Sequence, residues 1–206
     1  MILSIEGNIG SGKSTFVHLL KEHCKGREDI CFLQEPVEQW LSIKDDEGNI
    51  LQHYYKDQKK YSFAFQMMAY ISRLVILKNA IENPKYKYII TERCLHTDKY
   101  VFCKMLYDDG LISSIEYQIY NKWFYEFDNS KYTIVYLQCD PQVAYERVKI
   151  RARPEEDIPL EYLEKCHKYH EDWLEHIEII DANVDIHKNP EIVEDWFKIV
   201  MNLIMN

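Results

Sequence analysis

Short runs of apolar residues alternate along this chain with longer segments in which apolar residues recur every three or four positions. Short runs rich in Ile, Val, Phe and Tyr favour buried β-strands, whereas the longer periodic segments favour helices packed on a sheet. The expected strands cover residues 2–5, 30–34, 86–91, 132–138 and 177–180. The expected helices lie near residues 14–25, 58–82, 112–128, 141–151, 159–176 and 190–205.

Strands that alternate with helices predict an α/β fold, in which a five-stranded parallel sheet is covered by helices on both faces. Pro141, Pro159 and Pro190 stand where the first turn of a helix tolerates proline. The chain has no internal repeat and no linker-like tract, so we expect residues 1–206 to form a single domain. Functional side chains should then collect at the carboxyl ends of the strands.

The segment behind the first strand reads GNIGSGKST and matches the phosphate-binding loop G-x-x-x-x-G-K-[ST]. Its glycines let backbone N–H groups curl around phosphate oxygens, and the next helix points its positive end at the same anion. Lys13 is expected to reach the β- and γ-phosphates, and Ser14 to ligate Mg²⁺. The expected nucleotide contacts are Gly7, Asn8, Ile9, Gly10, Ser11, Gly12, Lys13, Ser14 and Thr15. A chance glycine-rich turn is the alternative, which the flanking strand and helix disfavour.

Charged residues follow the second and third expected strands. Glu35 ends the second strand, and Glu92 and Arg93 end the third, so all three should converge beside the phosphate loop. Glu35 is a candidate general base, Glu92 a candidate Mg²⁺ ligand, and Arg93 a candidate hold on an acceptor oxygen. The alternative is that they are solvated charges at strand ends.

An arginine cluster lies later, in the segment YERVKIRARPEED (residues 145–157). Arg147 and Arg151 are four residues apart on the expected helix and share a face, and Arg153 follows in a short polar segment. Three guanidinium groups beside an open loop suggest a lid that closes over triphosphate oxygens. A solvated helix face paired with neighbouring glutamates is the alternative.

Composition narrows the class of partner. A net charge of −9 over 206 residues argues against nucleic acid, which usually demands a basic face. No apolar run approaches the roughly 20 residues of a transmembrane helix, and no leader precedes the first strand, so a cytoplasmic protein is expected. The six cysteines form no C-x-x-C pair, which favours reduced thiols. Cys166, His167 and His170 lack a second ligand pair at zinc-like spacing.

Together these segments resemble the deoxyribonucleoside kinase family. The motifs that match in order are GNIGSGKSTFV, EPVEQW, YSFAFQ, SRL, TERCLHTDKYVF, RVKIRARPEED and IPLEYLEKCHKYHEDWL. The resemblance covers Ile2 to about Trp173. It implies a P-loop NTPase-type fold with an arginine-rich lid, ATP as phosphoryl donor, Mg²⁺ as cofactor, a deoxyribonucleoside 5′-hydroxyl as acceptor, and a homodimer.

The resemblance also assigns roles to individual residues. Glu35 is implied as the base on the 5′-hydroxyl, with Glu92 positioning the metal and Arg93 holding the 5′-oxygen. The residues implied around the acceptor are Trp40, Leu51, Tyr54, Tyr55, Phe65, Gln66, Phe102 and Glu156. Among these, Phe65 and Gln66 correspond to the residues that stack on the base and read its edge, and Tyr55 and Glu156 to the pair on the 3′-hydroxyl. Arg147, Arg151 and Arg153 match the lid arginines, and Asp185 and Ile186 lie in the expected loop over adenine.

Three positions depart from the pattern of the family. Cys94 and Leu95 replace a serine and a smaller apolar residue, and Tyr54 replaces methionine or leucine, which narrows the expected pocket. These departures bear on the choice of base rather than on the reaction.

Base preference should depend on Arg73 and Asp98. The resemblance implies this, because relatives that act on deoxycytidine and purine deoxynucleosides carry Arg and Asp at the matching positions. An ionised Asp98 only accepts hydrogen bonds, so it suits an exocyclic amine and opposes the oxygen of thymine. For these two residues the alternative is a structural Arg–Asp pair outside the pocket. For the base preference the alternative is a thymidine-preferring kinase.

Two other classes of nucleotide-binding protein are disfavoured. A nucleoside monophosphate kinase would present cations to its acceptor phosphate, where this chain has Glu35. A signalling GTPase needs D-x-x-G and N-K-x-D, whereas this chain lacks the first motif and reads NKWF at residues 121–124.

Overall fold

The computed structural model describes residues 1–128, 130–153, 158–174, 177–186 and 188–205. Its strands are β1 (Ile2–Glu6), β2 (Ile30–Leu33), β3 (Tyr88–Glu92), β4 (Tyr132–Gln138) and β5 (Glu178–Asp181). They form one sheet in the order β2-β3-β1-β4-β5, and every neighbouring pair is parallel. The predicted five-stranded parallel sheet is therefore confirmed, with strand ends displaced by one or two residues.

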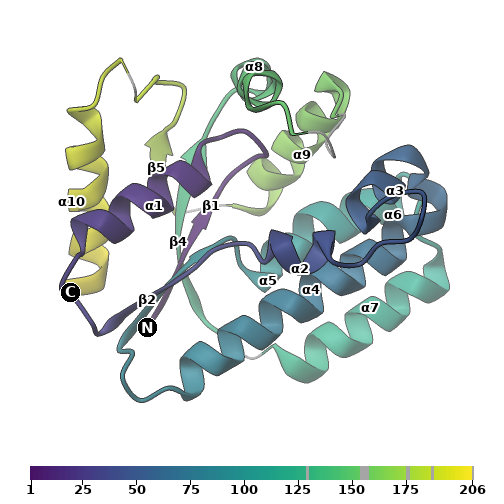
Figure 1. Ribbon diagram of the computed structural model, residues 1–206, viewed down its shortest axis with the longest axis horizontal. Coiled ribbons are helices and arrows are strands. Elements are labelled where there is room, and N and C mark those ends of the chain that lie inside the picture. Colours follow the sequence, from purple (N-terminus) through teal and green to yellow (C-terminus); the bar gives the residue numbers. More distant parts are fainter. Residues whose placement is uncertain (129, 154–157, 175–176, 187, 206) are drawn as a thin grey trace.

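Helices cover both faces of this sheet (Figure 1). On one face, α1 (Lys13–His23) and α10 (Ile192–Met205) pack Phe16 edge-on to Trp196, with the two ring centroids 5.6 Å apart. The opposite face packs against α4 (Gln58–Glu82). Successive strand residues supply the two cores in turn: Ile90 belongs to the α1 side and Ile89 to the α4 side. This alternation follows from the two-residue repeat of a strand.

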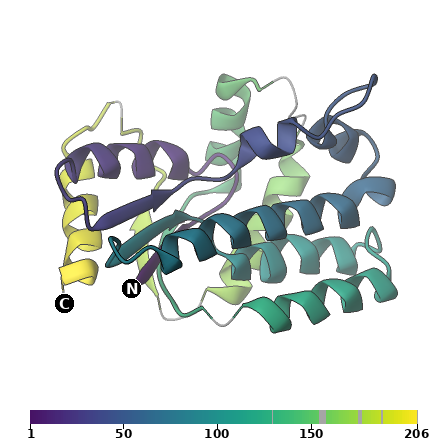
Figure 2. The ribbon, with the colours of Figure 1, turned by 60° about the horizontal axis from the view of Figure 1, so that its bottom comes forward.

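The longer helices have recognisable starts. α4 begins after Asp57, whose carboxylate accepts the Lys60 N–H, and α7 (Ser114–Phe127) begins with a capping box between Ser113 and Glu116. Pro141 occupies the first turn of α8 (Pro141–Arg151), and α9 (Leu160–Trp173) follows the lid segment. α4 and α7 lie side by side in Figure 1, and the Tyr70 and Tyr120 rings join them with centroids 5.4 Å apart. In the view of Figure 2 the helical run of residues 95–108 appears between them.

Several short helices were not predicted. α2 (Val37–Leu41) and α3 (Ile50–Lys56) lie between β2 and α4, and α5 (Leu95–Thr97), the π-helix η1 (Asp98–Cys103) and α6 (Lys104–Asp108) lie between β3 and α7. Each is too short for a helical period to appear in the sequence. They matter because α2, α3 and η1 supply one wall of the cavity described below.

Among the helices that the structure describes, none is long and apolar enough to cross a membrane. All six cysteines are free thiols, and every one except Cys31 is buried.

Candidate active site

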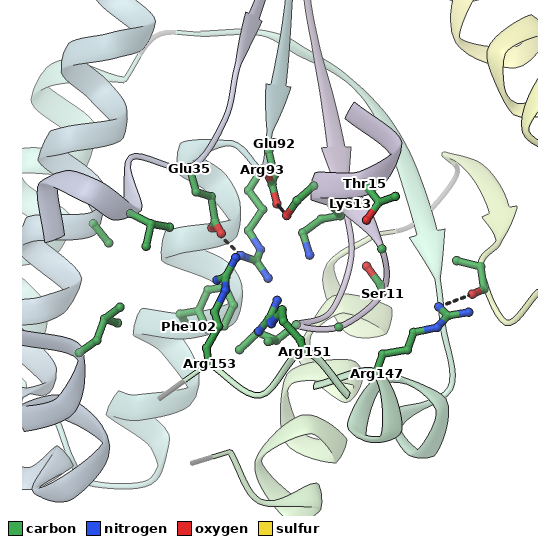
Figure 3. Close-up of a pocket in the computed structure, with 18 of the residues that line it drawn as sticks. Ser11, Lys13, Thr15, Glu35, Glu92, Arg93, Phe102, Arg147, Arg151 and Arg153 are labelled. Atoms are coloured by element: carbon green, nitrogen blue, oxygen red, sulfur yellow. Dashed lines mark hydrogen bonds and ion pairs between the residues drawn. The ribbon is translucent and has the colours of Figure 1, made fainter. Parts of the chain in front are cut away.

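A cavity of about 530 Å³ opens at the carboxyl edge of the sheet. The phosphate loop and the ends of β2 and β3 form its floor, and helices α2, α3, α4 and η1 form one wall. The segment 182–186, α8 and α10 close the other side. Figure 3 shows side chains from all these sides converging on one space.

The phosphate loop has a backbone that only glycine fits well. A Cβ on Gly10 would lie 2.4 Å from the carbonyl oxygen of Ala144, because α8 packs directly on the loop. Gly12 has a φ of 99° and forms the N-cap of α1, so the helix points its free N–H groups into the cavity. The Ser11 hydroxyl is buried in the loop without a hydrogen-bond partner among the described residues. An anion of phosphate size fits this donor set.

Lys13 lies within the loop, where its Nζ donates to the carbonyl oxygen of Asn8 at 2.6 Å. Burial, assisted by the charge of Arg93, lowers the pKa of Lys13 to about 7, against the opposing effect of nearby carboxylates. A bound phosphate would favour the charged form of this amine.

Two of the expected nucleotide contacts, Gly7 and Asn8, are not on the cavity wall. The Asn8 side chain points the other way, and its Nδ2 donates to the Leu163 carbonyl oxygen of α9 at 2.9 Å. Asn8 therefore joins the loop to α9, while Ile9, Gly10, Ser11, Gly12, Lys13, Ser14 and Thr15 line the cavity.

The donor types beside the loop fit a magnesium ion. The Ser14 hydroxyl donates to Glu92 Oε1 at 2.5 Å, which brings a hydroxyl and a carboxylate oxygen together at the start of α1. In the described ranges, no group of three or more His, Cys, Asp and Glu side chains is placed to hold a metal ion. Mg²⁺ suits such a sparse site, since it retains several waters and binds one or two carboxylates together with phosphates.

Glu35 stands two residues beyond β2 and faces the loop across the cavity (Figure 3). Arg93 Nη1 donates to Glu35 Oε1 at 2.5 Å, and Arg73 Nη2 donates to the same oxygen at 3.0 Å. Burial would raise the pKa of Glu35, but the charges of Arg93, Arg73 and Lys13 outweigh it and lower the pKa to about 2. Glu35 is thus ionised at neutral pH, and both described bonds from arginine end on Oε1. The expected convergence of Glu35, Glu92 and Arg93 is observed.

Arg73 and Asp98 form a buried pair that belongs to the cavity. Arg73 Nε donates to Asp98 Oδ2 at 2.9 Å, and Arg73 Nη1 donates to the Glu92 carbonyl oxygen at 2.8 Å. Both side chains line the cavity, so the alternative of a pair outside the pocket does not apply. Burial raises the pKa of Asp98, and the charge of Arg73 counteracts that rise.

Aromatic side chains form the wall beyond this pair. Phe65 lies between Trp40 and Tyr54, with ring centroids 5.5 Å and 4.8 Å away, and Arg93 sits over the ring of Phe102 at 5.1 Å. Leu51 and Tyr55 complete the wall. The Gln66 Oε1 atom is buried and has no hydrogen-bond partner among the described residues, so it is available to the edge of a flat ligand.

Tyr162 is a wall residue that the sequence did not reveal. Its hydroxyl lies 2.9 Å from the hydroxyl of Tyr54, which joins α9 to α3 across the cavity. Tyr54 therefore narrows the pocket not only through its ring but also by fixing a second ring beside it. The helical pattern placed Tyr162 on a helix but gave no sign that this face lines a cavity.

The three lid arginines do not point the same way. Arg147 Nη1 donates to the Ala182 carbonyl oxygen at 2.7 Å, and Arg147 Nη2 donates to the Val184 carbonyl oxygen at 3.1 Å, away from the phosphate loop (Figure 3). Arg151 and Arg153 reach towards the centre of the cavity. The expectation of three equivalent lid cations thus needs correction for Arg147, which fixes the segment 182–184. Glu156 lies outside the residues that the structure describes.

Asp185 and Ile186 line the end of the cavity next to α10, as expected for a loop over a flat base. Trp196 of α10 also lines this end and was not foreseen, because an apolar residue on an amphipathic helix signals a core position first.

Comparisons with known proteins agree with this arrangement. The family model for deoxynucleoside kinases matches residues 3–205, a range that includes every side chain lining the cavity. The chain is 36% identical over 199 residues to deoxycytidine kinase of Rattus norvegicus, with 84% of this chain and 75% of that protein covered. It is 38% identical over 177 residues to a probable deoxycytidine kinase of fowlpox virus, with 84% and 71% covered. It is 35% identical over 194 residues to a mitochondrial deoxyguanosine kinase of Xenopus laevis, with 84% and 72% covered.

Proposed function

The chain belongs to the deoxynucleoside kinase family, and on this basis we propose that it transfers the γ-phosphoryl group of ATP to the 5′-hydroxyl of a deoxyribonucleoside. One observation carries the proposal. The Glu35 carboxylate shares a single cavity with the phosphate loop on one side and with an aromatic wall on the other. A carboxylate in this position suits a neutral hydroxyl acceptor and repels an acceptor that is already phosphorylated.

The donor side follows from the loop and the lid. Lys13 and the loop N–H groups would hold the β- and γ-phosphates. Arg151 and Arg153 would bind the same phosphates from the side of the lid. Ser14 and Glu92 would hold Mg²⁺, which offsets phosphate charge when bound. Asp185, Ile186 and Trp196 would enclose the base of ATP.

The acceptor hydroxyl would bind Glu35 through Oε2, since both described bonds from arginine end on Oε1. Its proton passes to Glu35 as its oxygen bonds to the γ-phosphorus and the bond between that phosphorus and the ADP oxygen breaks. A carboxylate with a pKa of about 2 is a weak base. Proton transfer should therefore come late, after most of the P–O cleavage, as a loose transition state allows.

Base preference would follow from the Arg73–Asp98 pair. Asp98 can accept from the exocyclic amine of cytosine or adenine, whereas thymine presents an oxygen that would leave two acceptors unpaired. We therefore infer a preference for deoxycytidine and purine deoxynucleosides. A thymidine-preferring kinase is the alternative, and a nucleoside monophosphate kinase is less favoured because of Glu35. A cytoplasmic location stays a prediction from the sequence.

A homodimer is the second part of the proposal. Exposed apolar side chains occur on two helices that are in contact, α4 and α7: Ile71, Val75, Ile81, Ile115, Ile119, Trp123 and Phe127. Ile115 is 72% exposed and Trp123 43% exposed. Apolar side chains exposed together in this way are typical of protein interfaces. We infer that the same face of a second copy of the chain packs against them.

A panel of acceptors tests the reaction and the preference together. Wild-type protein with MgATP is assayed on the four deoxynucleosides and on their monophosphates, with product identified by chromatography. We expect 5′-monophosphates from deoxycytidine or purine deoxynucleosides at a higher kcat/KM than from thymidine. Turnover of monophosphates alone would contradict the proposed acceptor, and the highest kcat/KM for thymidine would contradict the role given to Asp98.

A further inference from the structure

Glu6, the last residue of β1, is a buried carboxylate that the site described above does not use. Its side chain is fully buried, and none of the described ion pairs includes it. Three neutral donors surround it instead. Ser4 Oγ and the Cys94 N–H donate to Oε1 at 2.5 Å and 2.9 Å, and Thr97 Oγ1 donates to Oε2 at 2.5 Å. Burying a carboxyl group is costly unless its oxygens are hydrogen-bonded, and these three donors meet that need.

Two of these donors stand directly next to functional side chains, at the two ends of the segment 93–98. Cys94 directly follows Arg93, and Thr97 directly precedes Asp98. Arg93 has a φ of 62°, in the left-handed region that a residue with a Cβ rarely adopts. Its N–H donates to the Ile5 carbonyl oxygen at 3.0 Å, and its own carbonyl oxygen accepts from the Thr91 hydroxyl. An unusual backbone of this kind persists only where its surroundings hold it.

Both ends of the segment lead to the same atom. Arg93 donates directly to Glu35 Oε1, and Asp98 holds Arg73, which donates to Glu35 Oε1 as well. We propose that Glu6 is a positioning residue for phosphoryl transfer. Through the Cys94 N–H and the Thr97 hydroxyl it fixes Arg93 and Asp98 at a set separation, and through them it orients the Glu35 carboxylate. The inference rests on the proposed function, because it concerns the same reaction.

Substitutions at Glu6 can distinguish a positioning role in catalysis from a role in protein stability alone. Glu6→Ala removes all three acceptor contacts, and since a misplacement near 1 Å can cost about 10²-fold in rate, we expect kcat to fall by about 10- to 100-fold with a smaller change in the KM for ATP. Glu6→Gln should retain most of the wild-type kcat. Its amide oxygen can accept from Cys94, and its NH₂ group can donate to the Thr97 hydroxyl, which accepts as readily as it donates.

Ser4→Ala is the matched control. It removes one hydrogen bond to the same carboxylate and the 3.4 Å contact with the Thr91 hydroxyl, while Thr91 can still donate to the Arg93 carbonyl oxygen. Because Ser4 itself contacts neither Arg93 nor Asp98, a lower Tm with an unchanged kcat is expected. Equal losses of kcat in Ser4→Ala and Glu6→Ala would reduce Glu6 to a stability role. A folded Glu6→Ala protein with wild-type kcat would overturn the inference.

Thr97→Val decides the matter if Glu6→Ala does not fold. This nearly isosteric change removes only the hydrogen bond between residue 97 and Glu6, next to Asp98. The crystal structure of the variant should show Asp98 displaced from Arg73, with the Cys94 N–H still bonded to Glu6. An Asp98–Arg73 contact unchanged from wild type would refute the inference, whether or not any acceptor is turned over. Loss of all activity in the wild-type panel would instead count against the proposed function alone.

Discussion

Lys13 and Glu35 are both buried beside the phosphate loop, yet their ionisation differs. Burial outweighs the nearby carboxylates at Lys13 and lowers its pKa to about 7, with Arg93 contributing in the same direction. At Glu35 the opposite balance holds, since Arg93, Arg73 and Lys13 outweigh burial and bring the pKa to about 2. The site without ligand therefore combines an ionised carboxylate with an amine that is partly neutral at pH 7.

ATP binding should then be coupled to proton uptake by Lys13. The pKa of the Lys13 amine is about 7 without ligand, and the charge of a bound phosphate raises it. At pH 8 a mostly neutral Lys13 must therefore gain a proton when ATP binds, and the affinity for ATP should fall as the pH rises above 7. Calorimetry in buffers of different ionisation enthalpy should show uptake approaching about one proton at pH 8 and little at pH 6. Lys13→Arg, which stays charged, should show no uptake. Proton release by the wild type at pH 8 would contradict the account.

At the scale of elements, the three arginines of α8 and the segment after it point in two different directions. Arg147 bonds to carbonyl oxygens of the segment 182–184, whereas Arg151 and Arg153 face the cavity. Arg147 should therefore affect the binding of ATP. Arg151 and Arg153 should stabilise the negative charge on the phosphoryl group during its transfer.

This division gives a testable pattern in the kinetics. Arg151→Ala and Arg153→Ala should each lower kcat by about 10²-fold or more, with deoxynucleoside affinity unchanged in calorimetry without ATP. Arg147→Ala should mainly raise the KM for ATP, because the loop beside its base loses its anchor. If Arg151→Ala weakened deoxynucleoside binding as much as it lowered kcat, the residue would belong to the acceptor side.

The sequence predicted the strands and the long helices and missed the short helices. In the described ranges, the five strands and the six helices of eleven or more residues were expected, the strands from their apolar runs and the helices from apolar residues that recur every three or four positions. The helices α2, α3, α5, η1 and α6 were missed, although α2, α3 and η1 form part of one wall of the cavity. α3 does begin with a local signal, a capping box between Asn49 and Gln52, which the apolar pattern alone did not use. Helices as short as these depend largely on tertiary packing.

A similar limit applies to side chains within the site. The carboxyl-edge rule sufficed to bring Glu35, Glu92 and Arg93 together, since parallel strands end at one edge. It could not show that Asn8 turns to α9, that Arg147 turns to the segment 182–184, or that Tyr162 meets Tyr54. Those directions depend on which helices pack against one another.

At the scale of the whole molecule, a net charge of −9 contrasts with a cavity lined by Lys13, Arg73, Arg93, Arg147, Arg151 and Arg153. The anionic donor is thus to be held by local cations, and association should weaken with salt less than it would for a broadly basic surface. The other whole-molecule feature is the apolar face of α4 and α7.

Charge placed on that face should separate the proposed dimer. Trp123→Glu is expected to convert a wild-type dimer into a monomer in sedimentation velocity, because a carboxylate buried in an apolar interface is strongly disfavoured. Ile179→Glu is the control, since Ile179 is 50% exposed on β5, away from α4 and α7. A monomeric wild type, or a Trp123→Glu variant that sediments as a dimer, would exclude this interface.

The most direct test concerns Glu35. Glu35→Gln keeps the size of the side chain but removes its ability to accept the acceptor proton, and loss of a general base typically lowers the rate by about 10²–10⁴-fold. Glu38→Gln, on the next helix and outside the cavity lining, serves as a control. The measurement is single-turnover phosphorylation of deoxycytidine by MgATP with enzyme in excess. The account predicts a loss of that size in Glu35→Gln with deoxycytidine binding retained and Glu38→Gln near wild type, whereas near-wild-type phosphorylation by Glu35→Gln would contradict it.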